Sequence, residues 1–334
     1  MAETKGRPIL VTGSYRSGST WVGKMIAASR EVGYVWEPLN PIHDRGLYRP
    51  EIEYYNIWIS AHNASGYDAG MRDLLKFGYN PLARMAGPGG FRNIPAALFY
   101  ATRYLGYRVE GRRPLLKDPM ALFSVAWIAE TFNAMVVVLI RHPAAFVNSL
   151  AKANWRYPFD HFLKQPRLID EHLSQFRGDI ERMARPGGDI VDEGILLWRL
   201  THHMIAGYQR EHPEWLFVRH EDLSRDPVHQ FEPLFQYLGL DYELNVRKYI
   251  DDCTRPGNPV ERPGEQWPAF ARLDSRRNVN RWAERLSQKD IERIREGTAD
   301  VWPHFFDEAD WKNALNAVAE FEEPPAPTVA RRIA

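Results

Sequence analysis

Eight residues near the N-terminus, Gly13-Ser-Tyr-Arg-Ser-Gly-Ser-Thr20, have the outline of a phosphate-binding loop. The two glycines have the right separation, but Ser19 stands where a lysine normally reaches the phosphates, and Arg16 supplies a cation inside the loop instead. Backbone amides of such a loop, and of a helix that follows it, still bind an anionic oxygen. This pattern favours a ligand with one phosphate carrying a transferable group over a nucleoside triphosphate with magnesium. The alternative is a glycine turn that opens a helix and leaves Arg16 in solvent.

Other chemically capable residues follow short apolar runs that predict strands. Glu37 follows residues 32–36, and Lys117 and Asp118 end the segment 114–119. Arg141 follows the apolar run Ala134 to Ile140 directly. Because the carboxyl ends of parallel strands meet at one edge of a sheet, a carboxylate and two cations there could serve one site. An arginine after a strand is more often a surface residue, so Arg141 alone decides nothing.

The elements that must position these residues alternate between strand and helix. Strands are predicted over 8–12, 32–36, 114–119, 134–140 and 215–218, and helices over 21–28, 120–131, from Pro143, 194–209, 227–238 and after the cap Ser287. Alternation of this kind predicts an α/β fold with a central parallel sheet covered by helices on both faces. Glu221 and Asp222 are placed on a strand, where adjacent side chains point to opposite faces, and a structural role is predicted for both.

One domain is predicted over residues 1–320. Residues 42–113 are rich in aromatics and glycine, lack a clear period, and are predicted to form an insertion or lid. Residues 321–334, with Glu-Glu-Pro-Pro-Ala-Pro, are predicted to be a disordered tail.

Composition limits the class of protein. Lys+Arg and Asp+Glu both total 43, so no global field draws the chain to nucleic acid or to an anionic membrane, and any anion site must be local. The single cysteine, Cys253, fits a reducing compartment, and a cytoplasmic enzyme is expected. The longest apolar run, 134–140, is far shorter than the roughly 20 residues of a membrane span, and the N-terminus shows no secretory signal.

The segment Arg16-Ser-Gly-Ser-Thr-Trp21 resembles the 5'-phosphosulfate loop of sulfotransferases that use 3'-phosphoadenosine-5'-phosphosulfate (PAPS). The resemblance implies a P-loop-like three-layer fold and donor contacts from Arg16, Ser17, Gly18, Ser19, Thr20 and Trp21. In that family an arginine at a strand end and a serine eight residues later bind the 3'-phosphate, which implies this role for Arg141 and Ser149.

Further matches follow in the family's order, and the resemblance covers most of the chain. They are Leu116-Lys-Asp-Pro119, Val218-Arg-His-Glu-Asp-Leu223 with Asp226-Pro227, and the basic loop Ser275 to Trp282. His220 stands where the family often has a tyrosine near the adenine, and Arg276 and Arg277 would add donors to the phosphate. A glycine pair found in the cytosolic small-molecule enzymes is absent from that basic loop, which leaves the individual contacts of the two arginines open.

Sulfuryl transfer needs in-line positioning and charge stabilisation on the leaving phosphate oxygen, for which Arg16 and Lys117 are the candidates. In the phenol and steroid enzymes a histidine two residues after the equivalent lysine is the base, but here that position is Pro119. Trp36-Glu-Pro-Leu39 resembles a segment of carbohydrate sulfotransferases, and Glu37 is therefore the predicted base. Asp118 is the second candidate for that role. The alternative is a structural Glu37 paired with Arg16 or Lys117.

No metal is expected, since neither His202-His203, His142 nor His212 has ligand spacing. The product would be the nucleotide 3',5'-ADP (PAP), and the acceptor a small molecule or glycan, with a carbohydrate or glycolipid hydroxyl favoured over a lipid or other small hydrophobic alcohol. Two other classes stay open: a P-loop kinase, which lacks its lysine here, and a non-catalytic nucleotide-binding protein. Oligomeric state is not predicted.

Overall fold

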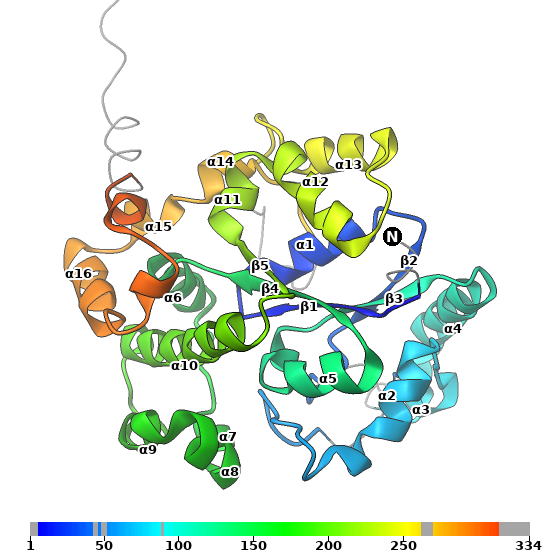
Figure 1. The fold of residues 1–334 in the computed structure, drawn as a ribbon, viewed down its shortest axis with the longest axis horizontal. Coiled ribbons are helices and arrows are strands. Elements are labelled where there is room, and N and C mark those ends of the chain that lie inside the picture. The colour runs from blue at the N-terminus through cyan, green and yellow to red at the C-terminus, as the bar shows by residue number, and fades with distance from the viewer. Residues whose placement is uncertain (1–5, 43–45, 48–51, 88–89, 262–269, 314–334) are drawn as a thin grey trace, which may run out of the picture.

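The computed structural model describes residues 6–42, 46–47, 52–87, 90–261 and 270–313. Five parallel strands form its centre in the order β2-β3-β1-β4-β5 (Figure 1). Their bounds are β1 Ile9–Gly13, β2 Val32–Trp36, β3 Arg113–Lys117, β4 Met135–Ile140 and β5 Leu216–Arg219. The predicted α/β fold with a central parallel sheet flanked by helices is confirmed, and each of the five predicted strands is present within two residues of its expected bounds.

Sixteen α-helices are described around this sheet. They are α1 Ser19–Ile26, α2 Asp68–Leu75, α3 Pro81–Met85, α4 Ile94–Val109, α5 Val125–Phe132, α6 Pro143–Ala153, α7 Asp160–Leu163, α8 Pro166–Leu168, α9 Arg177–Met183, α10 Ile190–Glu211, α11 His220–Arg225, α12 Pro227–Leu238, α13 Leu244–Thr254, α14 Ser275–Asn278, α15 Arg281–Arg285 and α16 Gln288–Gly297.

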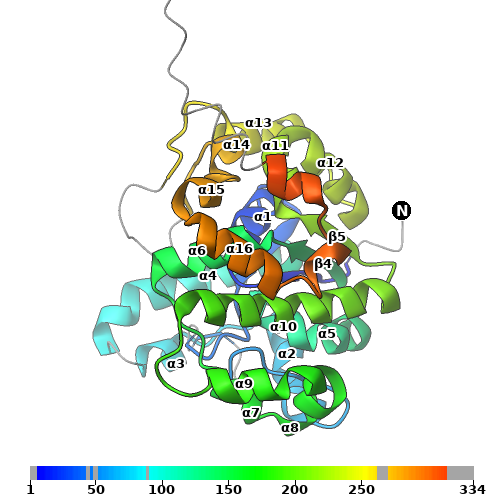
Figure 2. The same cartoon turned by 90° about the vertical axis from the view of Figure 1, so that its left-hand side faces the viewer.

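Each face of the sheet has its own hydrophobic core because side chains alternate along a strand. Leu10, Val136 and Val138 pack with α5, α6 and α10 on one face. Val11, Val137 and Leu139 pack with α1, α12 and α13 on the other. Figure 1 shows these two helix layers above and below the strands, and Figure 2 shows α10 crossing under β4 and β5.

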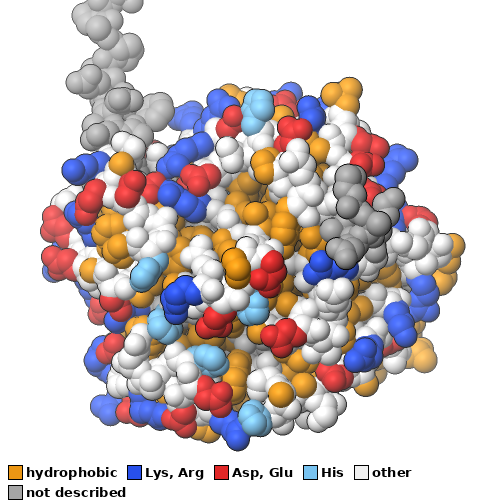
Figure 3. Space-filling model, viewed as in Figure 1, with side chains coloured by type: hydrophobic (Ala, Val, Ile, Leu, Met, Phe, Trp, Pro, Cys, Tyr) orange, Lys and Arg blue, Asp and Glu red, His pale blue; other side chains and the backbone are white. Residues whose placement is uncertain are grey.

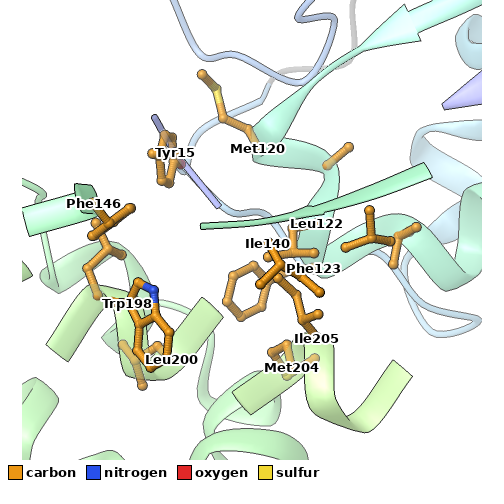
Figure 4. Close-up of a cluster of buried hydrophobic side chains, with 14 of the residues drawn as sticks. Tyr15, Met120, Leu122, Phe123, Ile140, Phe146, Trp198, Leu200, Met204 and Ile205 are labelled. Atoms are coloured by element: carbon orange, nitrogen blue, oxygen red, sulfur yellow. The ribbon is translucent and has the colours of Figure 1, made fainter. Parts of the chain in front are cut away.

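Aromatic and aliphatic side chains join α10 to the sheet. Trp198 is fully buried, and Figure 4 shows it beside Leu200 and Phe146, with Ile140, Phe123 and Ile205 grouped next to them. The helix predicted over 194–209 is longer at its N-terminus, since Asp189 accepts hydrogen bonds from the Val191 and Asp192 amides (2.9 and 3.3 Å) and caps it there.

Several sequence predictions are corrected by the backbone. The helix predicted over 120–131 begins as a 3₁₀ turn, Pro119–Ser124, before α5. Glu221 and Asp222 lie in the first turn of α11 instead of on a strand, because β5 ends at Arg219. The sequence predicts no helix within 42–113, but the 16-residue helix α4 lies there. The cap at Ser287 is confirmed, since its hydroxyl accepts the Asp290 amide (3.1 Å).

Charged side chains of both signs are intermixed over the face of the molecule seen in Figure 3. No helix within the described ranges is long and apolar enough to cross a membrane. The predicted disordered tail, 321–334, lies outside the described residues.

Candidate active site

Four strand ends place the loop after β1, Glu37, Lys117 and Arg141 along one edge of the sheet. Trp36 of β2 pairs in register with Lys117 of β3, and Gly13 of β1 pairs with Leu139 of β4. Glu37, Asp118 and Arg141 are each the next residue after their strand. Because all strands are parallel, the loops that carry these residues leave the sheet on the same side.

The loop after β1 requires glycine at two points. At Gly13 (φ 140°) a Cβ would lie 2.3 Å from the Leu139 carbonyl oxygen, so only a glycine lets β1 and β4 come this close. At Gly18 (φ 88°) a Cβ would lie 2.4 Å from His220 Nδ1. The loop is therefore shaped by contacts with β4 and α11.

The start of α1 is well suited to an anion. Gly18, at the N-cap, provides no side-chain cap, and the first turn contains no acidic residue. The buried hydroxyls of Ser14 and Ser17 have no hydrogen-bond partner within the described part of the chain. Free helix amides and unsatisfied buried hydroxyls are costly unless a ligand accepts their hydrogen bonds, so this loop fits a phosphate or sulfate oxygen.

Arg16 and Ser149 are brought together although 133 residues separate them. Arg16 has a left-handed backbone (φ 59°), and its Nε donates to Ser149 Oγ on α6 at 2.9 Å. The residue predicted to contact the 5'-phosphosulfate thus touches a residue predicted to contact the 3'-phosphate.

Arg141 is held at the end of β4 by Glu221. Its Nε lies 3.4 Å from Glu221 Oε1, and the same carboxylate oxygen accepts the His142 amide at 3.0 Å. Burial lowers the pKa of Arg141, and the adjacent Glu221 opposes that shift. These contacts fit the structural role predicted for Glu221, which makes them from a helix instead of a strand.

His220 closes the loop from the side of α11. Its ring meets Trp21 edge-on, with centroids 5.3 Å apart, and its Nδ1 has no hydrogen-bond partner among the residues described. Burial lowers the pKa of His220 well below its usual value, so the imidazole is neutral at pH 7.

Glu37 and Lys117 form a buried ion pair across β2 and β3. Lys117 Nζ contacts Glu37 Oε1, and Asn40 Nδ2 donates to Glu37 Oε2 at 2.9 Å. Lys117 is fully buried, and burial lowers its pKa, with Glu37 opposing the shift. This is the pairing with Lys117 that the structural alternative for Glu37 expected, and Asn40 is a partner that the sequence analysis missed.

Asp118 is bound to the backbone on both oxygens. Oδ2 accepts the Leu39 amide at 2.6 Å and Oδ1 accepts the Met120 amide at 2.9 Å. Burial, and secondarily the charge of Glu37, raises the pKa of Asp118 to about 7. The carboxylate thus fixes the turn that contains Glu37, whose φ of 44° is unusual for a residue other than glycine.

Tyr15 joins an aromatic cluster near the carboxylates. Its hydroxyl donates to Asn56 Oδ1 at 2.9 Å, and its ring lies 5.0 Å from Trp155 and 6.0 Å from Tyr157. Burial raises the pKa of Tyr15, to which Asp118 and Glu37 contribute as nearby negative charges. These three rings lie outside the aromatic-rich segment 42–113, and no sequence motif predicted them as site residues.

Arg276 and Arg277 lie on α14, and both are exposed. The helix is held to α11 by Ser275 Oγ, which donates to the Ser224 carbonyl at 2.8 Å. Within the described ranges, no group of three or more His, Cys, Asp or Glu side chains could hold a metal ion.

Comparison with known proteins adds one curated relative and several solved structures. Carbohydrate sulfotransferase 1 of Danio rerio is 32% identical over 116 residues, which is 33% of this chain and 26% of the relative. The chain thus matches about a quarter of that relative's length.

Two solved structures are similar in shape. A sulfotransferase domain from the curacin biosynthetic pathway has 14% identity and a TM-score of 0.44, covering 88% of this chain and 97% of that one. The sulfotransferase domain of the Synechococcus PCC 7002 olefin synthase has 20% identity and a TM-score of 0.43, covering 87% and 94%. Both TM-scores are below 0.5, and the fold assignment therefore rests on the strand order and register of this chain.

The family model described as the sulfotransferase family matches residues 8–244, a span that contains β1 to β5 and every site residue discussed above except Arg276 and Arg277. With more than half of its length matched, this chain belongs to the sulfotransferase family.

Proposed function

We propose that this protein transfers a sulfuryl group from PAPS to the hydroxyl of an acceptor. The observation that carries the proposal is the loop after β1, where an uncapped helix N-terminus, two unsatisfied buried serine hydroxyls and Arg16 converge. These donors suit a phosphosulfate, and the loop lacks the lysine of a nucleoside triphosphatase.

The nucleotide would lie across β1 and β4. Backbone amides from Ser17 to Thr20 and the side chain of Arg16 would hold the 5'-phosphosulfate, with Trp21 and His220 on the adenine side. Arg141 and Ser149 would hold the 3'-phosphate. Arg276 and Arg277 are exposed on α14, where they would add charge above the nucleotide.

Glu37 would take the proton of the acceptor hydroxyl as its oxygen attacks sulfur. The bond between sulfur and the bridging phosphate oxygen breaks, and the electron pair stays on the phosphate of PAP. Arg16, in the loop after β1, and Lys117, at the end of the neighbouring strand β3, would stabilise that negative charge. Lys117 already contacts Glu37, so one buried cation would serve both the base and the leaving group.

The acceptor is proposed to be a carbohydrate or glycolipid hydroxyl. The segment Trp36 to Leu39 resembles that branch of the family, and the curated relative from Danio rerio is named a carbohydrate sulfotransferase. The aromatic cluster of Tyr15, Trp155 and Tyr157 also suits a small hydrophobic or lipid alcohol, which is the second candidate. Residues 42–113 are proposed to form an insertion on the acceptor side.

The test is a calorimetric titration without metal, using PAP and 5'-AMP as ligands. We expect PAP to bind and 5'-AMP to bind far more weakly, because only PAP carries the 3'-phosphate. In Ser149→Ala, the affinity for PAP should fall by roughly tenfold to a hundredfold, the effect of one charge-assisted hydrogen bond. The affinity for 5'-AMP should fall less, because Ser149 acts on the 5'-phosphate only through Arg16.

Transfer itself is then assayed with PAPS against sugars, glycolipids and hydrophobic alcohols. If PAP binds but no acceptor is sulfated, the protein is a nucleotide-binding protein without this activity. If ATP with magnesium binds better than PAP, the sulfuryl-transfer proposal is wrong and the loop serves a kinase.

A further inference from the structure

Exposed apolar side chains are concentrated in one part of the molecule. Among the described residues, eight large apolar side chains are exposed, and only Leu244 lies outside the segment 42–113. The other seven are Ile42, Leu82, Phe91, Leu98, Phe99, Leu105 and Val109. Six of these seven lie on α3, the turn Gly90–Asn93 and α4, which contact one another. Single exposed apolar residues are normal, but a group on adjoining elements marks an interaction surface.

Helix α4 is apolar on its outward face as well as on its inward face. Its inward side chains Tyr104 and Tyr107 pack against Phe77, at centroid distances of 6.2 and 5.3 Å. At 100° per residue, the opposite side presents Leu98, Leu105 and Val109, which are 58, 57 and 78% exposed. A helix that is hydrophobic on all sides is expected inside a protein or against a partner.

No charged residue interrupts that outward face. The positions between its apolar residues are Pro95, Thr102 and Gly106. The Thr102 hydroxyl donates to the carbonyls of Leu98 and Phe99, both at 3.0 Å, so its hydrogen bond is made within the helix. The Thr102 hydroxyl therefore needs no hydrogen bond with water when this face is covered.

Arginines lie on both flanks of the apolar face of α4. Residues 81–109 contain four arginines and no acidic residue, although the whole chain has a net charge of zero. Arg103 and Arg108 lie on opposite flanks of the face, with Arg103 over the Phe99 ring (6.0 Å) and Arg108 Nε donating to the Lys76 carbonyl (3.1 Å). Arginines beside an apolar helix face keep their charged ends at the level of lipid headgroups.

We propose that α3, the turn Gly90–Asn93 and the outward face of α4 dock this protein on an anionic lipid bilayer. We name these elements the α3–α4 surface. The apolar side chains would enter the boundary between headgroups and acyl chains, and the arginines would contact lipid phosphates. A second copy of the chain is disfavoured, because an isologous contact through this face would set arginines against arginines.

The α3–α4 surface lies beyond the β2 edge of the sheet, on the side of the two strands that lead to Glu37 and Lys117 (Figure 1). Figure 1 shows α2, α3 and α4 gathered beyond the β2 edge of the sheet, and α4 leads into β3, which ends in Lys117. The chain after Glu37 reaches α3, since the Gly46 carbonyl accepts the amide of Asn80, the N-cap of α3, at 2.8 Å. Docking would therefore hold the site close to acceptors carried in the membrane.

Vesicle co-sedimentation tests this inference, and it does not depend on catalysis. The full chain is mixed with phosphatidylcholine vesicles that either contain or lack phosphatidylglycerol. We expect sedimentation with the anionic vesicles, little with phosphatidylcholine alone, and loss of binding as salt concentration rises. For the triple variant Leu98→Gln, Leu105→Gln, Val109→Gln, the affinity for anionic vesicles should be lower than that of the unsubstituted chain by roughly tenfold or more.

Leu244→Gln is the matched control, because Leu244 is 81% exposed on α13, away from this surface. Its vesicle binding should equal that of the unsubstituted chain, and all variants should share one melting temperature because only exposed side chains change. Equal binding by the triple variant, or no binding to anionic vesicles, overturns the proposal. A dimer that forms without vesicles and dissociates in the triple variant would show that a second copy covers this face.

Discussion

At the scale of single residues, the site is organised around two carboxylates with different environments. Glu37 contacts a lysine and an asparagine side chain, whereas Asp118 accepts two backbone amides. A base must receive a proton from substrate, while a carboxylate that satisfies two backbone donors holds the chain in place. This difference separates a proposed catalytic role for Glu37 from a positioning role for Asp118.

Replacement of Glu37 by Gln tests the first role. The amide keeps an oxygen for Lys117 but cannot accept a proton, so we predict a fall in kcat of about 10²- to 10⁴-fold with unchanged affinity for PAP. Steady-state kinetics and calorimetry measure the two quantities. A variant that retains full kcat would remove Glu37 from the reaction and leave it as the structural partner of Lys117.

Replacement of Asp118 by Asn tests the second role. One of its two backbone donors would then face an amide NH₂, so we predict a loss of about 1–3 kcal/mol in the free energy of unfolding together with a lower kcat. Denaturant titration measures the stability. If kcat collapses while stability is unchanged, Asp118 is the base and the roles are reversed.

At the scale of elements, the loop after β1 is fitted to α11 through Gly18. A methyl group there would meet His220 Nδ1, and the backbone is left-handed as well. We predict that Gly18→Ala costs about 1–3 kcal/mol of stability and weakens PAP binding at least roughly tenfold, because the loop or His220 must move.

Gly187→Ala is the matched control for that substitution. Gly187 has a similar φ of 95°, but no atom within 4 Å of the added Cβ. Gly187→Ala should therefore lose only the stability that a left-handed backbone costs an alanine, and its affinity for PAP should be unchanged. Equal effects of the two variants on PAP binding would mean that the contact with His220 is unimportant.

Helix α4 shows why part of the element pattern escaped prediction. The strands were found because short apolar runs bounded by Gly, Pro or charged residues suffice to predict a buried parallel strand, and 32–36 was placed at its observed bounds. A surface helix is recognised by a polar face, and α4 has none on its outward side. Its apolar residues lie on both the inward and the outward side of the helix, so no 3.6-residue period stands out.

The site was only partly predictable, because sequence shows where strands end but not how the following loops pack. The end of a buried strand can be predicted from sequence, because an apolar run stops there. Glu37, Lys117 and Arg141 stand at such positions and were predicted as site residues. Asn40, the contact of Glu221 with Arg141 and the two amides bound by Asp118 depend on how loops turn back after the strands. Those contacts are tertiary, and no local spacing encodes them.

At the scale of the whole molecule, two neutral histidines are built into the core beside Arg141. His142 stacks on Trp282 with centroids 4.9 Å apart, and His202 stacks on Trp198 at 4.0 Å. Burial lowers the pKa of each to about 3. Their stabilising effect is complete above the ordinary histidine pKa of about 6.5 and is lost as pH falls from there toward 3, because the unfolded chain binds protons that the folded chain excludes.

We therefore predict that the free energy of unfolding falls by about 1.4 kcal/mol per pH unit for each of these histidines below about pH 6. His142→Phe should reduce this slope and keep stability at pH 7, since neither ring nitrogen of His142 has a hydrogen-bond partner in the described part of the chain. Denaturant titrations between pH 4 and pH 7 measure the slope. His62→Phe, at an exposed position, is the control, and an equal slope in His142→Phe and the unsubstituted chain would contradict the prediction.

The strand order also bears on how a site of this kind diversifies. β1 and β4, proposed to bind the nucleotide, lie side by side, and β2 and β3, proposed to face the acceptor, form the adjoining half of the sheet. The acceptor half is encoded by one unbroken stretch, from β2 to β3, that contains neither Arg16, Arg141 nor Ser149. Mutation and recombination within that stretch, short of Lys117 at its end, can therefore change which acceptor is modified while Arg16, Arg141 and Ser149 are inherited unchanged.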